Sequence, residues 1–168
     1  MKRMTIGSLL ALVFLFSFLA TPNAEMAKEG TESTIEYFHG THQSLAMEKE
    51  SVQMNWEVWG VIVSDTVEGL FHNLSFHCLG GLYAVKGVFD NETGMCEYTR
   101  PNGDKVYTTF KAAGEFDKPI KGRATIIGGT GEVKNISGTM EYETNLLRPA
   151  AEGTFQGYVK NKWHWKIP

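Results

Sequence analysis

The segment from Ile126 to Tyr142 constrains the fold of this chain more than any other part of the sequence. It reads Ile126-Ile-Gly-Gly-Thr-Gly-Glu-Val-Lys-Asn-Ile-Ser-Gly-Thr-Met-Glu-Tyr142, with two β-rich runs around four glycines. Glycine tolerates positive φ angles and lets another backbone come close, so a strand pair can turn at these positions. We therefore predict a strand pair of a small antiparallel β-barrel, although the segment specifies no reaction.

Short runs of β-branched and aromatic residues recur from Thr34 onward, separated by Gly, Asn and Asp. In the longest run, Ser51–Ser64, both faces are partly apolar, which is typical of a barrel wall with a filled or ligand-bearing interior. The other predicted strands are Thr34–Phe38, His42–Glu48, Leu70–Cys78, Leu82–Phe89, Gly94–Thr99, Lys105–Ala112, Gly122–Ile127, Ser137–Thr144, Gly153–Tyr158 and Lys162–Ile167.

The connections between these runs favour a closed architecture. Arg100-Pro-Asn-Gly-Asp104 is a strong hairpin signal, and Asp90-Asn-Glu-Thr-Gly94 predicts a looser turn. No window after the N-terminal apolar run shows helical periodicity. The fold class is therefore all-β, a closed or nearly closed antiparallel barrel, with a two-sheet sandwich as the alternative.

The N-terminus has the pattern of a secretory signal peptide. Lys2 and Arg3 precede a charge-free apolar run over 6–20, which is shorter than the roughly 20 residues needed to span a bilayer. Cleavage after Ala24 is favoured over an uncleaved anchor, with Ala27 as the second choice. The predicted parts are a signal peptide at 1–24, a flexible N-terminal segment at 25–33 and a single β-barrel domain at 34–168. The mature protein is expected to be secreted or periplasmic and to have no membrane span.

Charge argues against a nucleic-acid partner. The chain has 16 basic and 19 acidic residues, and loss of Lys2 and Arg3 with the signal peptide leaves 14 basic residues and a net charge of about −5. The basic residues are dispersed rather than clustered, so no binding face for nucleic acid is predicted. The sequence contains nothing that specifies an oligomeric state.

Cys78 and Cys96 are the two cysteines of the chain, and both lie in predicted strands on either side of residues 87–94. Two cysteines in an oxidising compartment normally form a disulfide. The bridge would close a short loop and contribute about 3 kcal/mol by the chain-entropy relation. Two buried free thiols or a metal site are the alternatives.

The glycine-rich segment also carries a family resemblance. Gly128-Gly-Thr-Gly-Glu-Val-Lys-Asn-Ile-Ser-Gly138 resembles the Gly-Gly-Thr-Gly-Lys-aromatic-x-Gly-aliphatic-x-Gly stretch of secreted bacterial proteins with an allene-oxide-cyclase-like barrel. Those proteins also tend to carry a His-Cys pair, here His77-Cys78, and a second cysteine before an Asp-Gly-Asp type turn. In this chain Cys96 precedes Asn102-Gly-Asp104.

The resemblance covers roughly 71–143 and implies an eight-stranded barrel of calycin-like shape, in a group whose members mostly have no assigned function. The chain departs from the pattern at Glu132, Val133 and Asn135, which replace the Lys, the aromatic residue and a Gly. The catalytic residues of the cyclase are not transferred, because no motif of that enzyme aligns here position by position.

Motifs for known chemistry are weak. The glycine-rich segment lacks the Gly-Lys-Ser/Thr ending of a P-loop and any βαβ unit, so no nucleotide cofactor is predicted. The pairs His39/His42 and His72/His77 raise a metal hypothesis, but zinc-type Cys/His spacings are absent and no metal is predicted. No Gly-x-Ser-x-Gly elbow is present for a nucleophilic serine.

Aromatic residues indicate a ligand site more clearly, because a small barrel can keep an apolar cavity with a few orienting polar groups. A carboxyl group beside a tryptophan there could have a raised pKa and act as an acid or base. The candidate ligand-binding residues are Trp56, Glu57, His77, Tyr98 and Glu141.

Three functional hypotheses follow from the sequence, and no catalytic signature selects among them. The first is a non-catalytic secreted or periplasmic barrel that binds a small apolar molecule. The second is a cyclase or isomerase of a reactive apolar substrate, since confinement and a few polar groups leave little trace in a sequence. The third is a structural envelope protein with a solidly packed barrel.

Overall fold

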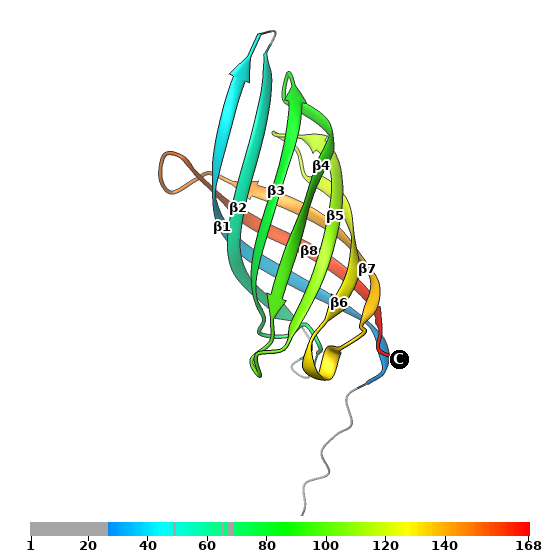
Figure 1. Ribbon diagram of the computed structural model, residues 1–168. Coiled ribbons are helices and arrows are strands. Elements are labelled where there is room, and N and C mark those ends of the chain that lie inside the picture. The colour runs from blue at the N-terminus through cyan, green and yellow to red at the C-terminus, as the bar shows by residue number, and fades with distance from the viewer. Residues whose placement is uncertain (1–26, 49, 65, 67–68) are drawn as a thin grey trace, which may run out of the picture.

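The chain forms a closed antiparallel β-barrel in which strands pair in sequence order and β8 returns to β1 (Figure 1). The computed structural model describes residues 27–48, 50–64, 66 and 69–168, so the predicted signal peptide lies outside the described residues. The strands are β1 (Glu29–Met47), β2 (Ser51–Ser64), β3 (Ser75–Val85), β4 (Val88–Thr99), β5 (Lys105–Glu115), β6 (Ile120–Gly129), β7 (Ser137–Leu147) and β8 (Thr154–Lys166), with a 3-10 turn η1 (Gly131–Val133) between β6 and β7. The prediction of an eight-stranded barrel rather than a sandwich is confirmed. Within the described residues, no helix has the length and hydropathy to cross a membrane.

Two of the strands are longer than the sequence predicted. β1 joins the predicted runs 34–38 and 42–48 and begins at Glu29, so residues 29–33 belong to the barrel wall rather than to a flexible segment. Gly40 interrupts the sequence pattern but not the strand. A Cβ there would lie 2.5 Å from the Glu57 carbonyl oxygen, so this glycine permits a close approach of β2 and does not form a turn. β8 likewise joins the predicted runs 153–158 and 162–167.

Two predictions around β3 and β4 were wrong. The predicted strand Leu82–Phe89 contains the turn between β3 and β4, where Lys86 and Gly87 have φ angles of 53° and 79°. The predicted turn at 90–94 lies inside β4 instead. There Asn91 Oδ1 accepts a hydrogen bond from the Tyr83 backbone N–H at 2.8 Å, and Asn91 Nδ2 donates one to the Tyr83 carbonyl oxygen at 3.0 Å. The register of the two strands shifts at this point. An asparagine that satisfies a strand irregularity has the same local signature as one in a turn.

The glycine-rich segment forms the connection that its sequence predicted, with β6 and β7 on either side of η1. Gly131 has a φ of 52°, and a Cβ there would lie 1.7 Å from the Asp104 carboxylate, so only glycine fits. Asp104 in turn accepts a hydrogen bond from the Glu132 backbone N–H at 2.9 Å, which ties this connection to the 100–104 hairpin. The connection lies at the lower end of the barrel in Figure 1. Its Val133 side chain is fully buried.

The same end of the barrel is closed by the segment 70–74, which the sequence assigned to a strand. Leu70, Phe71 and Leu74 are buried in the core, and the Phe71 ring stacks on Trp163 with a centroid distance of 3.9 Å. The Phe71 backbone N–H donates to Glu32 Oε2 at 3.2 Å, which fixes the segment against β1. These apolar residues therefore form a floor below the sheet rather than a part of its wall.

Cys78 and Cys96 form the predicted disulfide. They are directly opposed residues of β3 and β4, and both side chains face the barrel interior. The bridge encloses the short β3–β4 hairpin, with a sequence separation of 18.

Replacing both cysteines by alanine should lower the free energy of unfolding by about 3 kcal/mol, because the unfolded chain regains the entropy that the bridge removes. Urea denaturation followed by circular dichroism, with and without reductant, measures this loss. Reductant should destabilise the parent protein and leave the double variant unchanged. An equal urea midpoint for the parent protein in both conditions would contradict the expected contribution.

Candidate ligand-binding cavity

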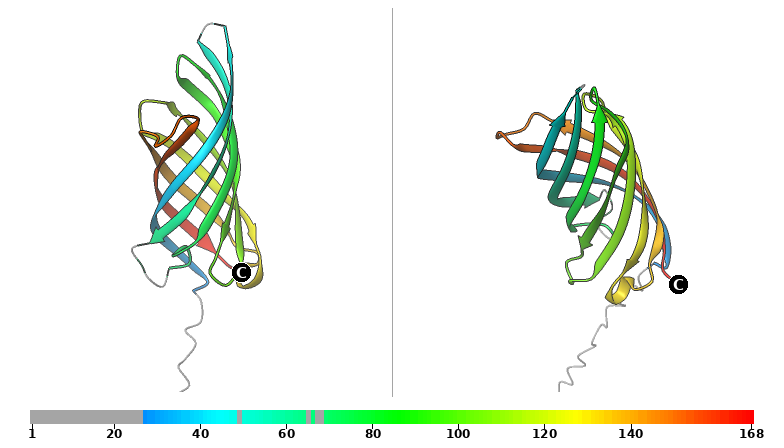
Figure 2. Two further views of the ribbon diagram at one scale, coloured as in Figure 1. Left: turned by 90° about the vertical axis from the view of Figure 1, so that its left-hand side faces the viewer. Right: turned by 45° about the horizontal axis from the view of Figure 1, so that its top comes forward.

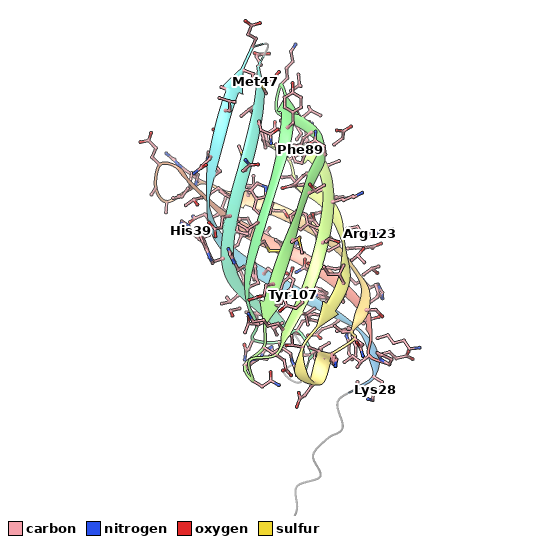
Figure 3. The ribbon with its side chains drawn as sticks, in the orientation of Figure 1. Lys28, His39, Met47, Phe89, Tyr107 and Arg123 are labelled. Carbon is pink, nitrogen blue, oxygen red and sulfur yellow. A yellow bond between two sulfur atoms is a disulfide. The ribbon has the colours of Figure 1, made fainter. Side chains whose placement is uncertain are left out.

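A cavity of about 270 Å³ lies inside the barrel, and every strand contributes to its lining. Alternate residues of a strand face opposite sides of a sheet, so Met54, Trp56 and Val58 of β2 face the cavity together. His39 of β1, between the inward-facing Phe38 and Gly40, projects from the outer surface (Figure 3). The volume is close to the lower end of the range of about 300 to 1,000 Å³ for small-molecule sites.

The cavity opens at the end of the barrel opposite the floor. There β1 pairs with β8 only as far as Thr41, while its pairing with β2 continues to Met47, so the β1–β2 hairpin extends beyond the closed wall (Figure 2). Lining residues near this point, His42, Phe155 and Leu146, are partly or largely exposed. Deeper lining residues such as Tyr98 and Thr108 are fully buried.

Glu36 lies in the deep, buried part of the lining with 4% of its surface exposed. Burial away from water raises the pKa of its carboxyl group to about 8, and polar contacts with Asn161 and Tyr98 act in the opposite direction. Its Oε1 atom has no hydrogen-bond partner among the described residues. Burial, and then the charge of Glu36, raise the pKa of the Tyr98 hydroxyl as well.

A second carboxyl group, that of Glu92, lines the cavity from β4. Trp56 Nε1 donates to Glu92 Oε1 at 3.1 Å. Burial raises the pKa of Glu92 to about 7, and the tryptophan hydrogen bond limits the increase. The pKa of the nearby Tyr142 hydroxyl is raised by burial and then by the charges of Glu92 and Glu36.

Aromatic rings form one wall around Trp56. The indole stacks on Phe110 with a centroid distance of 5.5 Å and meets the edge of Phe155 at 6.4 Å. Phe110 in turn contacts Tyr142 at 6.4 Å in an edge-to-face arrangement. Such rings supply apolar surface to a ligand together with a negative π-face.

The five residues predicted as a site are divided between the two faces of the wall. Trp56 and Tyr98 line the cavity. Glu57 and His77 lie on the outer face, where His77 Nε2 and Glu57 Oε1 are 2.7 Å apart and the imidazole stacks on Trp59. Glu141 is also exposed on the outer face and pairs at 2.9 Å with Arg123. Figure 3 shows Arg123 at the outer surface.

The two cavity carboxyl groups were missed by the sequence analysis. Glu36 belongs to the alternating inward series that includes Glu32, Thr34 and Phe38. Its inward direction could therefore have been predicted from the alternation by taking Phe38 as a core residue. Glu92 lay in a predicted turn and carried no signal. The His39/His42 and His72/His77 pairs do not gather with other donors, since the described part of the chain has no group of three or more metal-binding side chains.

Two solved structures show low-level similarity to this chain. The pterocarpan synthase dirigent protein GePTS1 has 12% sequence identity, with 84% of this chain and 87% of that chain covered and a TM-score of 0.26. The enduracididine biosynthesis enzyme MppR, complexed with the condensation product of pyruvate and imidazole 4-carboxaldehyde, has 6% identity, coverages of 89% and 93%, and a TM-score of 0.27. At these scores neither protein is a guide to the activity of this chain. No family model and no curated protein matches the sequence.

Proposed function

We propose that this protein is a secreted or periplasmic barrel that binds a small, mainly apolar molecule in its interior. The observation that carries the proposal is the cavity of about 270 Å³, which is closed by a packed floor and open at the other end. Its lining is mainly apolar and includes a few polar groups at defined depths, as small-molecule sites do. A structural protein with a solid interior would lack such a volume.

Two further observations support the location and the class of protein. The Cys78–Cys96 disulfide fits an oxidising compartment, as does the signal-peptide pattern of the sequence. The barrel and the glycine-rich connection fit membership of the allene-oxide-cyclase-like group. We assign the chain to that group as part of the same proposal.

Binding can be tested with the neutral fluorescent probe N-phenyl-1-naphthylamine and by quenching of tryptophan emission. The probe should gain fluorescence with the protein, and Trp56 in the cavity wall should respond to it. Thr144→Trp, which places a bulky ring in the lining near the mouth, should reduce probe affinity by about tenfold or more because it removes ligand space.

The matched control is Thr139→Trp, on the exposed outer face of the same strand β7. It adds the same ring outside the barrel and should leave probe affinity unchanged. The proposal fails if apolar probes of several sizes change neither the probe fluorescence nor the tryptophan emission. It also fails if Thr144→Trp and Thr139→Trp weaken probe binding equally.

A second function, a cyclase or isomerase of a reactive apolar substrate, is favoured by one observation. Glu92 has a pKa near 7 in a mainly apolar cavity and can both give and accept a proton at neutral pH. A compound that the probe assay shows to bind should then be converted by the parent protein. Glu92→Gln should bind the compound without converting it, and unchanged turnover in this variant would remove the acid–base role.

A further inference from the structure

The cavity lining contains acidic side chains and almost no basic ones. Glu36 and Glu92 both face the interior, and among the described lining residues the only basic side chain is that of His42, near the mouth. The other titratable lining groups are the hydroxyls of Tyr98 and Tyr142, which carry no positive charge. Buried carboxyl groups are normally paired with a cation or with several hydrogen-bond donors, and this cavity supplies few of either.

Glu36 shows this imbalance most directly. Its side chain is almost fully buried, it faces the cavity, and its Oε1 atom has no partner among the described residues. The polar side chains in contact with it, those of Asn161 and Tyr98, are uncharged. A buried acceptor left open toward a cavity is a position that a donor on a ligand can occupy.

Glu92 adds a counter-ion beside an aromatic wall. The carboxyl group is held by the indole N–H of Trp56, whose ring is in contact with Phe110 and Phe155. Tyr142 continues this wall next to Phe110. A carboxylate next to several aromatic rings is the arrangement that attracts an ammonium group, through charge and through cation–π contact.

From this geometry we propose that the cavity binds a small organic cation, an ammonium group on an apolar body, with Glu92 as the counter-ion beside the rings of Trp56 and Tyr142. This inference rests on the proposed function and specifies the chemical class of its ligand. Glu36 offers a second acceptor deeper in the cavity, for a donor on the apolar body of the same ligand. An anionic ligand is disfavoured, because no lysine or arginine among the described residues faces the cavity.

Cation binding should be coupled to proton release. The pKa values of Glu92 and Glu36, about 7 and about 8, leave both carboxyl groups wholly or partly protonated in the free barrel at pH 7. A bound cation favours the carboxylate form and lowers the pKa of its counter-ion. A neutral ligand has no such effect, so proton release distinguishes the two ligand classes independently of affinity.

The test compares two probes of nearly identical shape, phenyltrimethylammonium and the neutral tert-butylbenzene. Isothermal titration calorimetry is run at pH 7.0 in phosphate and in HEPES, which differ in ionisation enthalpy, with the protein titrated into the sparingly soluble neutral probe. We expect the cation to bind at least about tenfold more tightly and to release up to about half a proton, because Glu92 is near its titration midpoint at this pH and holds about half a proton in the free barrel. The neutral probe should release none.

Glu92→Gln keeps the size of the side chain and the acceptor for the Trp56 N–H while removing the charge. It should abolish the advantage of the cation and the proton release, and it should leave the affinity for tert-butylbenzene within about twofold. Glu97→Gln is the matched control, since Glu97 lies on the outer face of the same strand and pairs with Lys105. This control should behave as the parent protein does.

Three results would overturn the inference. Equal or tighter binding of tert-butylbenzene removes the cation preference and leaves the proposed apolar-ligand function intact. Preference for the cation in both Glu92→Gln and the parent protein places the cation elsewhere than at Glu92. Failure of both probes overturns the inference as well, and the naphthylamine assay then shows separately whether the proposed function fails with it.

Discussion

Replacing Glu36 by glutamine should stabilise the barrel by about 3 kcal/mol at pH 7 and leave its stability at pH 4 nearly unchanged. The pKa of this carboxyl group is about 8 in the folded protein, against an ordinary value of 4.5 that applies to the unfolded chain. Below pH 4.5 both states hold the proton, so the group contributes no pH dependence. Between pH 4.5 and 8 the unfolded chain releases the proton and the folded barrel keeps it, so stability falls as pH rises.

Urea denaturation of the parent protein and of Glu36→Gln at pH 4, 7 and 9 measures the difference. Glutamine is an uncharged side chain of the same size as protonated glutamate, so the variant isolates the ionisation of this group. The gap between the two proteins should be near zero at pH 4, should widen through pH 7, and should level off above pH 8, where the folded barrel also releases the proton. Glu97→Gln, outside the barrel, should show no comparable gap. A constant difference at all three pH values would mean that Glu36 is not a proton-holding group of the folded barrel.

Most of the barrel wall could be predicted from local sequence, because strand alternation and turn chemistry are short-range properties. The Ser51–Ser64 strand and the 100–104 hairpin follow from neighbouring residues. The Cys78–Cys96 bridge follows instead from the presence of two cysteines in a chain expected to enter an oxidising compartment. The errors occur where tertiary packing determines the role of a residue. Gly40 is a strand residue rather than a turn residue, and a glycine is needed there because the neighbouring β2 backbone comes close. Phe71 is an apolar residue of the floor, where it packs on Trp163, and not a residue of the wall.

The site was less predictable than the wall. The alternation of side chains along a strand assigns residues to two faces but does not show which face points into the barrel. Trp56 and Tyr98 were found through their size, and their part in ligand binding is still a prediction. Glu57 and Glu141 were chosen beside aromatic residues and lie on the outer face. Glu36 and Glu92 contradict the rule that charged residues point to water, and residues that break this rule are the ones expected at a functional site.

Removing the Phe71 ring should destabilise the barrel by about 3 to 5 kcal/mol, the cost of deleting a fully buried phenylalanine. Phe71 is completely buried and stacked on Trp163, which is itself completely buried. In Phe71→Ala, Trp163 loses its stacking partner and a void is left between the floor and the wall. The backbone N–H of residue 71 still reaches Glu32, so the variant tests the packing and not the hydrogen bond.

Urea denaturation followed by far-ultraviolet circular dichroism is the suitable measurement, because the fluorescence of Trp163 will itself change. Phe71→Leu should recover more than half of the lost stability, since it refills most of the void. Tyr37→Ala removes an aromatic ring of similar size from the outer face of β1, where 51% of the residue is exposed, and should cost less than about 1 kcal/mol. If Phe71→Ala costs no more than Tyr37→Ala, the floor is not a packed part of the core, and the cavity would then be open at both ends.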